Sequence, residues 1–193
     1  MDKKVIRIGS IGLGGIWSGV HGPGIARSAD LQLTAICDID VQKLQEMGEK
    51  YGIDEAHRFT KYEDLIRCSD VDAVDICTPN DLHYEMAMAA VAVGKPYTIE
   101  KPITLTSEQA DTLAKATQEK GIKHMVCFSY RFKAAARYAR ELIRLLGTDR
   151  VMFGTDYPVK LHGEEIERLL AVGLEEHELE DIFYNNAKRF LKL

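Results

Sequence analysis

The chain has 193 residues and a formal net charge of −5 at pH 7, and 46% of its residues are hydrophobic. This composition is typical of a soluble globular protein, and the length allows one large domain, or one domain with an appendage, around a sizeable core. There is no long run of Lys or Arg and no apolar run near the roughly 20 residues that span a bilayer, which argues against a nucleic-acid groove and a membrane span.

The N-terminus and the cysteines indicate the compartment. Residues 1–4 lead directly into a strand-like pattern, without the apolar segment of a signal peptide. The four cysteines show no CxxC spacing, and three of them lie in apolar strand-like runs, where small buried hydrophobic residues are common. We therefore expect a cytoplasmic protein without nucleic-acid or membrane partners.

Strand and helix patterns alternate along the chain, which predicts an α/β fold with a Rossmann-type doubly wound parallel sheet. The expected strands are 5–11, 31–37, 71–77, 96–100, 122–128 and 150–154. The expected helices are a stretch ending near 28, then 40–50, 62–67, 81–93, 106–120, 132–146, 164–171 and 175–191. We expect six strands in the order 3-2-1-4-5-6, so that residues 1–147 form a dinucleotide-binding domain and residues 148–193 complete the same sheet.

The first expected strand ends in a glycine-rich loop. This loop consists of Gly12, Leu13, Gly14, Gly15 and Ile16. Glycine permits a positive φ and lets a diphosphate approach without a Cβ in the way, and the next backbone N–H groups face the anion at a helix start. Trp17 stands where a third small residue is usual, so these residues alone leave open a glycine-rich turn of any α/β protein.

Asp38 follows the second expected strand, 24 residues beyond Gly14. A carboxylate at this point can accept hydrogen bonds from both adenosine ribose hydroxyls, and it repels a 2′-phosphate. Residues 39–40 offer no Arg to accommodate such a phosphate, so the sequence predicts NAD(H) rather than NADP(H) as the cofactor. The alternative is that Asp38 only caps the following helix.

Four motifs share features with one family of enzymes. They are the loop at 12–16, Ala-Ile-Cys-Asp at 35–38, residues 74–83 and Gly-Lys-Pro-Tyr-Thr-Ile-Glu-Lys-Pro at 94–102, with a weaker fifth at 128–132. With them, residues 4–144 resemble the nucleotide-binding half of the Gfo/Idh/MocA-type oxidoreductases, which are sugar, inositol and related polyol dehydrogenases. The resemblance implies an NAD-binding Rossmann domain.

The resemblance also implies roles for residues at two strand ends. Those that would line the cofactor after the third expected strand are Thr78, Pro79 and Asn80, with His83 just behind them. Glu100 and Lys101 would stand near the nicotinamide, where the family's lysine polarises the reacting hydroxyl or carbonyl and helps to move its proton. The alternatives are a surface histidine at 83 and an exposed strand-end lysine at 101.

The rest of the chain departs from that family. Residues 148–193 resemble the last strand and final helix of amidohydrolase-related TIM-barrel enzymes, in which the aspartate matching Asp156 is a metal ligand or catalytic base. One carboxylate does not hold a zinc ion, and His162 and His177 are expected in solvent, so we expect no metal site. The chain therefore has the pattern of a chimera.

The leading hypothesis is an NAD(H)-binding module without the family's substrate domain, and with little or no turnover. Under this hypothesis Lys101 is a catalytic residue that has lost its function. One alternative is a working NAD-dependent oxidoreductase acting on CH–OH groups, in which Lys101 is catalytic and a partner supplies the missing groups. Another is a recombined or engineered α/β scaffold without activity. A homodimer is among the expected assemblies, because a missing second domain would leave a face of the first uncovered.

Overall fold

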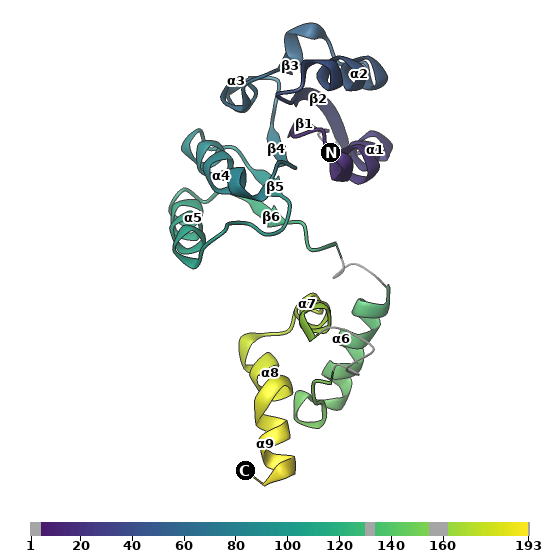
Figure 1. The fold of residues 1–193 in the computed structure, drawn as a ribbon, viewed down its shortest axis with the longest axis vertical. Coiled ribbons are helices and arrows are strands. Elements are labelled where there is room, and N and C mark those ends of the chain that lie inside the picture. Colours follow the sequence, from purple (N-terminus) through teal and green to yellow (C-terminus); the bar gives the residue numbers. More distant parts are fainter. Residues whose placement is uncertain (1–4, 130–133, 155–161, 193) are drawn as a thin grey trace. The chain divides into compact units, whose positions relative to one another are not determined.

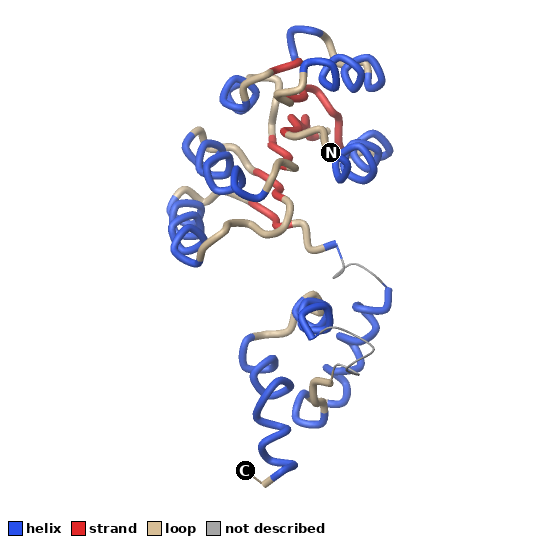
Figure 2. The backbone as a smooth tube through the Cα atoms, in the orientation of Figure 1, coloured by secondary structure: helices blue, strands red, loops and turns tan. Residues whose placement is uncertain are grey.

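The structure, a computed structural model, describes residues 5–129, 134–154 and 162–192. The chain divides into two compact units, residues 1–127 (unit 1) and 128–193 (unit 2). Figure 1 shows the course of the chain through both units, and Figure 2 shows that the strands all belong to the first. Among the described residues, no helix combines the length and the apolar character needed to cross a membrane.

Unit 1 contains a six-stranded parallel sheet in the order β3-β2-β1-β4-β5-β6, which confirms the predicted Rossmann-type fold. The strands are β1 Ile6–Ile11, β2 Leu31–Cys37, β3 Arg58–Phe59, β4 Ala73–Ile76, β5 Tyr97–Ile99 and β6 His124–Val126. The sheet order changes direction between β1 and β4. The carboxyl ends of these two strands therefore border the crevice in which open α/β sheets bind ligands.

The structure differs from the expected strands in two ways. β3, which pairs with Ile36 and Cys37, was not expected, because two residues are too short to show a period-2 pattern. The strand expected at 150–154 does not form. Thr148–Arg150 is a 3-10 turn, and Val151–Gly154 is not part of any strand. The sixth place in the sheet belongs to β6, so residues 148–154 do not complete it.

Helices cover both faces of the sheet in unit 1. They are α1 Gly22–Arg27, α2 Val41–Tyr51, α3 Tyr62–Arg67, α4 His83–Ala92 and α5 Ser107–Glu119. α1 and α2 lie on one face and α3, α4 and α5 on the other, as expected when right-handed crossovers run in opposite directions from the switch point (Figure 1). Thr106 is the N-cap of α5, because its hydroxyl accepts from Gln109 N at 3.2 Å. The Gln109 side chain accepts from Leu105 N, one residue before the cap, so the pair is not a full capping box.

Two apolar clusters fill the core of unit 1. The larger includes Val74, Ile76 and Ile99 from the sheet with Ala87 and Leu113 from the helices, and these side chains are almost completely buried. The smaller surrounds Trp17. The sheet is thus buried on both faces, which explains why its strands read as nearly continuous apolar runs.

Unit 2 is helical. Its helices are α6 Ala134–Leu146, α7 His162–Leu170, α8 Glu176–Glu180 and α9 Asn186–Leu191, with a π-helical turn at Asp181–Asn185 between the last two. The backbone N–H of Phe153 donates to the carbonyl of Ile182 at 2.9 Å, which holds the 151–154 segment against this last helical run. Phe190 and Leu191 near the end of this run are 73% and 61% exposed.

Candidate functional site

The glycine loop meets the end of β4 at the switch point of the sheet. Gly12 has φ +86°, and a Cβ at this position would lie 2.8 Å from the carbonyl carbon and oxygen of Cys77. Its N–H donates to the carbonyl of Cys37 at 2.8 Å. Gly12 therefore joins the ends of β1, β2 and β4, and only a residue without a side chain fits there.

The next part of the loop is open. A Cβ on Gly14 or Gly15 would meet no atom within 4 Å, and the side chain of Ile16 is 46% exposed. The helix begins here, since Ser18 N donates to the carbonyl of Gly14 at 2.9 Å. The loop thus has room at a helix N-terminus for a diphosphate, as the sequence predicts.

Trp17 faces the protein interior and leaves the mouth of the loop free. It is completely buried against Leu13 and Ile36, and its ring makes an edge contact with Tyr51 at a centroid distance of 5.4 Å. A Cβ on Gly22 would come within 3.1 Å of the indole, so a glycine one turn later makes the room that the large ring needs. The loop and helix pack well although the usual small residue is replaced.

Asp38 binds the glycine loop to the end of β2. Its Oδ2 accepts from Leu13 N at 2.8 Å, and its Oδ1 accepts from Asp40 N at 2.9 Å. Lys43 Nζ is 3.7 Å from Oδ2. The helix N-cap is Asp40, whose carboxylate accepts from Gln42 N and Lys43 N, so the alternative role of Asp38 as the cap is excluded.

The turn after β4 is tied to the turn after β5 through His83. This imidazole is completely buried, with Nε2 2.9 Å from the carbonyl oxygen of Thr78 and Nδ1 2.6 Å from that of Pro102. The alternative of a surface histidine is therefore wrong. Pro79 and Asn80 follow Thr78 in a short 3-10 turn at Asn80–Leu82.

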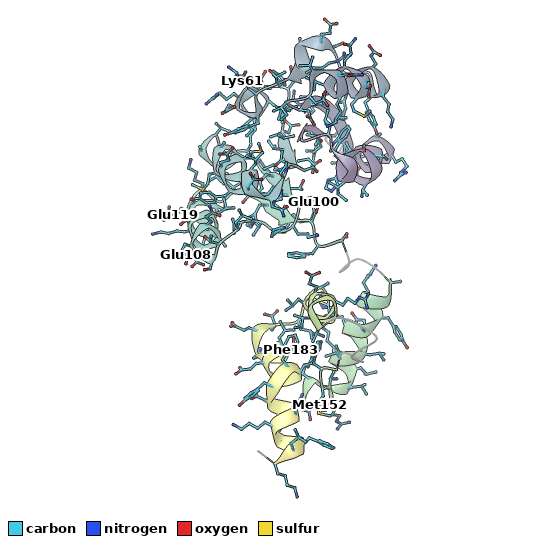
Figure 3. All side chains as sticks on the ribbon, viewed as in Figure 1. Lys61, Glu100, Glu108, Glu119, Met152 and Phe183 are labelled. Carbon is cyan, nitrogen blue, oxygen red and sulfur yellow. The ribbon has the colours of Figure 1, made fainter. Side chains whose placement is uncertain are left out.

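Glu100, which Figure 3 labels, and Lys101 lie directly after β5. The Lys101 backbone N–H donates to Glu100 Oε2 at 3.1 Å. The Lys101 side chain is exposed, and within the described parts of the chain its ammonium makes no hydrogen bond or ion pair. It is thus available to a ligand bound at the carboxyl ends of the strands.

A row of polar residues that the sequence analysis missed crosses the sheet below these turns. Ser10, Asp75 and Thr98 are direct neighbours in the register of β1, β4 and β5. Asp75 accepts from Ser10 Oγ at 3.1 Å and from Thr98 Oγ1 at 2.8 Å. Each of the three lies two positions before the first residue after its own strand, which is Gly12, Cys77 or Glu100. This common spacing from the strand ends is the signal by which the sequence could have shown the row.

His21 joins this row from the helical side. It lies in a π-helical turn, Trp17–His21, with Nδ1 2.9 Å from Asp75 Oδ1 and Nε2 3.0 Å from Glu100 Oε1. The hydrogen bond and charge of Asp75, followed by those of Glu100, raise the pKa of His21 to about 9, against the opposing effect of burial. Nothing in the local sequence indicates this role, because both partners are more than 50 residues away.

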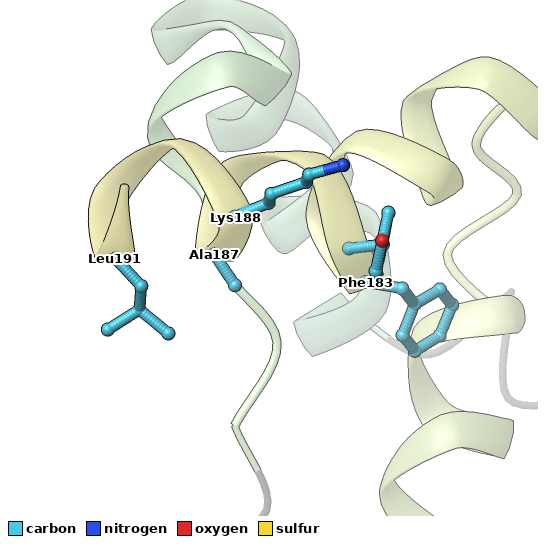
Figure 4. A pocket seen from close by; sticks show the side chains of 5 residues that line it. Phe183, Ala187, Lys188 and Leu191 are labelled. Atoms are coloured by element: carbon cyan, nitrogen blue, oxygen red, sulfur yellow. The ribbon is translucent and has the colours of Figure 1, made fainter. Parts of the chain in front are cut away.

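A separate apolar hollow occurs in unit 2, along the last helical run. It is lined by Phe183, Tyr184, Ala187, Lys188 and Leu191 (Figure 4). The Lys188 ammonium lies 5.6 Å from the centre of the Tyr184 ring. None of the predicted cofactor-binding residues belongs to this hollow, so it adds nothing to the dinucleotide site.

The strand order, the open glycine loop and the strand-end acid fit one family. The family model for oxidoreductases with an NAD-binding Rossmann fold, Gfo/Idh/MocA, matches residues 6–128. The chain belongs to this family.

Several relatives combine this domain with sugar or polyol chemistry. The chain is 29% identical over 143 residues to D-glucoside 3-dehydrogenase of Escherichia coli, covering 74% of this chain and 40% of that enzyme. Scyllo-inositol dehydrogenase from Lactobacillus casei, solved with NAD(H) and scyllo-inositol, has TM-score 0.69 at 28% identity, over 74% of this chain and 42% of that one. A 3-ketoreductase from Actinomadura kijaniata, solved with NADP, has TM-score 0.68 at 27% identity, over 74% and 44%.

The Gfo/Idh/MocA chain thus spans about two fifths of the length of these relatives. A second family model, for amidohydrolases, matches residues 106–193. This match confirms the predicted composite pattern, and it begins earlier than the expected residue 148. Asp156 and residues 130–132 lie outside the described residues, as do the details of the His162 side chain, and His177 is exposed on α8.

Proposed function

We propose that unit 1 binds NAD(H) in preference to NADP(H), and that the chain by itself has little or no turnover. The observation that carries the preference is the position of Asp38. Its carboxylate is fixed by the N–H groups of Leu13 and Asp40 beside the open glycine loop, where an adenosine ribose would lie. A 2′-phosphate at this place would meet a negative charge, which Lys43 at 3.7 Å offsets only in part.

Low turnover is supported by what surrounds Lys101. Within the described residues its ammonium has no partner that would orient it or accept its proton. The relatives are more than twice as long as the region they share with this chain, and residues 106–193 match a different family. General acid–base catalysis needs a group held within hydrogen-bond reach of the substrate. We propose that this chain lacks most of that arrangement.

A test of binding can use Trp17, which is the only tryptophan in the chain and is buried beside the loop. Adding NADH should quench its emission by energy transfer to the bound nicotinamide. Gly14→Val should abolish the quenching, because a branched side chain would occupy the space for the diphosphate. Gly24→Val is the matched control, since Gly24 is also open but lies on the exposed side of α1.

NADPH measured in the same way should bind at least tenfold more weakly than NADH, in line with the 1–3 kcal/mol commonly lost to a badly placed charge. If the protein is folded and millimolar NADH does not change its Trp17 emission, the result would instead support the inactive-scaffold hypothesis. Equal binding of NADH and NADPH would refute only the proposed preference.

A working dehydrogenase remains the second candidate, favoured by the exposed position of Lys101 next to Glu100 at the carboxyl end of β5. It predicts polyol-dependent reduction of NAD that disappears in Lys101→Ala. Activity that survives this substitution would exclude the proposed role of Lys101. A homodimer is the partner arrangement we propose for that case, and light scattering would detect it.

A further inference from the structure

The two nitrogens of His21 face two carboxyl groups in the interior of unit 1. Asp75 is 4% exposed, and the His21 side chain is 13% exposed. Asp75 already accepts hydrogen bonds from Ser10 and Thr98, so it meets His21 Nδ1 as a further acceptor. A ring nitrogen that contacts a carboxylate oxygen at 2.9 Å must carry a proton.

The same reasoning applies to the other ring nitrogen. Nε2 lies 3.0 Å from Oε1 of Glu100, which is also an acceptor. A neutral imidazole carries one proton and can satisfy only one of these contacts, whereas the imidazolium satisfies both. Between two ionised acids this geometry favours a positively charged His21, and the raised pKa of His21 agrees with it.

Glu100 transmits this arrangement to the cofactor site. While Oε1 contacts His21, Oε2 accepts from the backbone N–H of Lys101 at 3.1 Å. Both oxygens of Glu100 are thus held, and the backbone at the end of β5 is held with them. Without the proton on Nε2, Glu100 would face an unprotonated nitrogen and a second buried acid, Asp75.

We propose that His21 is a positioning residue of the dinucleotide site, whose doubly protonated ring holds Glu100 and the Lys101 backbone in the geometry that binds NADH. This inference rests on the proposed NAD(H) function. It assigns a role to the π-helical turn at Trp17–His21, which sets the His21 ring against the ends of β4 and β5.

Two cysteines are the other titratable groups beside His21 and its partners. Burial, with Asp75 nearby, raises the pKa of the Cys127 thiol to about 12 and raises that of Cys77 still further. Both therefore stay neutral between pH 7 and pH 10. Among His21, its two acidic partners and these two thiols, His21 is the group whose charge changes in this interval.

The first experiment measures the His21 titration directly by NMR of ring-labelled histidine. We expect a pKa near 9 in the wild type. Asp75→Asn and Glu100→Gln should each lower it toward the ordinary value, because each removes one negative charge. A wild-type His21 that titrates near the ordinary value would overturn the proposal, whether or not NADH binds.

The second experiment measures NADH affinity at pH 7 and pH 10 in the wild type, in His21→Gln and in His57→Gln. His57 is the matched control, because its Nε2 also contacts an aspartate, Asp70, at 3.1 Å, and it lies outside the site. We expect the wild type to bind about tenfold more weakly at pH 10, the cost of one charge-assisted hydrogen bond. His21→Gln should bind weakly at both pH values, and His57→Gln should behave as the wild type does.

The possible failures can be told apart. If no variant binds NADH at either pH, both the proposed function and this role of His21 are overturned. If NADH binds but the affinities of wild type and His21→Gln agree at both pH values, the positioning role alone is overturned. Emission of Trp17 at pH 10 checks that unit 1 remains folded during the measurement.

Discussion

The two units differ in how much apolar surface each buries. Unit 1 buries a large apolar core, and its buried polar side chains Ser10, Asp75 and His83 have hydrogen-bond partners, whereas the Trp17 indole N–H has none. Among the described residues of unit 2, the clustered apolar side chains that are buried are Ile143, Val172 and Ile182. Leu145 is 82% and Phe190 73% exposed, even though α6 and α7 are strongly amphipathic.

The difference shows what a sheet contributes to an independent domain. Parallel strands bring apolar side chains from distant parts of the chain together, and their carboxyl ends assemble polar groups at one edge. Helices that share one small cluster bury less apolar area per residue and therefore gain less free energy on folding. We expect unit 1 to be the more stable unit and to hold the cofactor site by itself.

The largest expected effect separates the stabilities of the two units. Ile182→Ala should destabilise unit 2 by about 3 kcal/mol, because Ile182 is almost fully buried in a three-residue cluster. Hydrogen exchange across residues 134–192 should then increase, while Trp17 emission, which reports on unit 1, should not change. Leu191→Ala is the control, since Leu191 is 61% exposed and should cost less than about 0.5 kcal/mol. A shifted Trp17 unfolding midpoint in Ile182→Ala would show that the units unfold together.

The next effect is a pH dependence confined to unit 1. The pKa of folded His21 is raised from 6.5 to about 9, so its ion pairs stabilise the fold fully below pH 6.5 and are lost as the pH rises through 9. Allowing for solvent screening, we expect unit 1 to lose about 2 kcal/mol between pH 6 and pH 10. Denaturant unfolding followed by Trp17 emission measures this loss. The same slope in His21→Gln would mean that another group is responsible.

A smaller effect concerns NADH binding. Asp38→Ala should weaken NADH binding by about 1.5 kcal/mol, roughly tenfold, through the loss of a charged acceptor for the ribose. Calorimetric titration gives the affinity. Asp40→Ala should lower the stability of α2 by about 1 kcal/mol as an N-cap and leave NADH affinity unchanged. Unaltered affinity in Asp38→Ala would remove the main support for NAD(H) preference.

The smallest expected effects are similar in the two units, because helix caps act locally. Thr106→Ala removes the acceptor for Gln109 N, and Glu178→Ala removes the acceptor that lies 2.7 Å from Glu175 N. Each should cost about 1 kcal/mol in the unit that contains it. Thermal unfolding checks both, with Thr112→Ala as a mid-helix control on the exposed face of α5. If only one of the two substitutions lowers the unfolding temperature, the cap in the other unit does not contribute to its stability.

The sequence was sufficient to predict most of the fold of unit 1, because the patterns that indicate its loop and strand ends lie within short stretches of chain. Strand–glycine–helix patterns fix the loop at 12–16, and the strand-end position of Asp38 predicts where its carboxylate lies. β3 escaped prediction because two residues carry no periodicity. His21 escaped because its function depends on Asp75 and Glu100, which are 54 and 79 positions away in the chain.

In unit 2 the expected helices are present, but the strand expected at 150–154 does not form, for a related reason. The apolar run at 150–154 has the composition of a strand, but a strand also needs a neighbour with free hydrogen-bonding groups. Here the segment is held by other contacts. The side-chain amide of Asn186 donates to the carbonyls of Thr148 and Val151, each at 2.7 Å. The composition of residues 150–154 indicated an extended segment. Its hydrogen-bond partners come from the last helical run and are visible only in the structure.

The position of β6 at the edge of the sheet has a consequence for any join made behind the first unit. Every strand of the sheet precedes residue 127, where the first unit ends. A genetic crossover after this point removes no strand from between two others and breaks no inner ladder of hydrogen bonds. The segment that follows the cofactor-binding fold can therefore be exchanged for another without any change to the strands that form the nucleotide site.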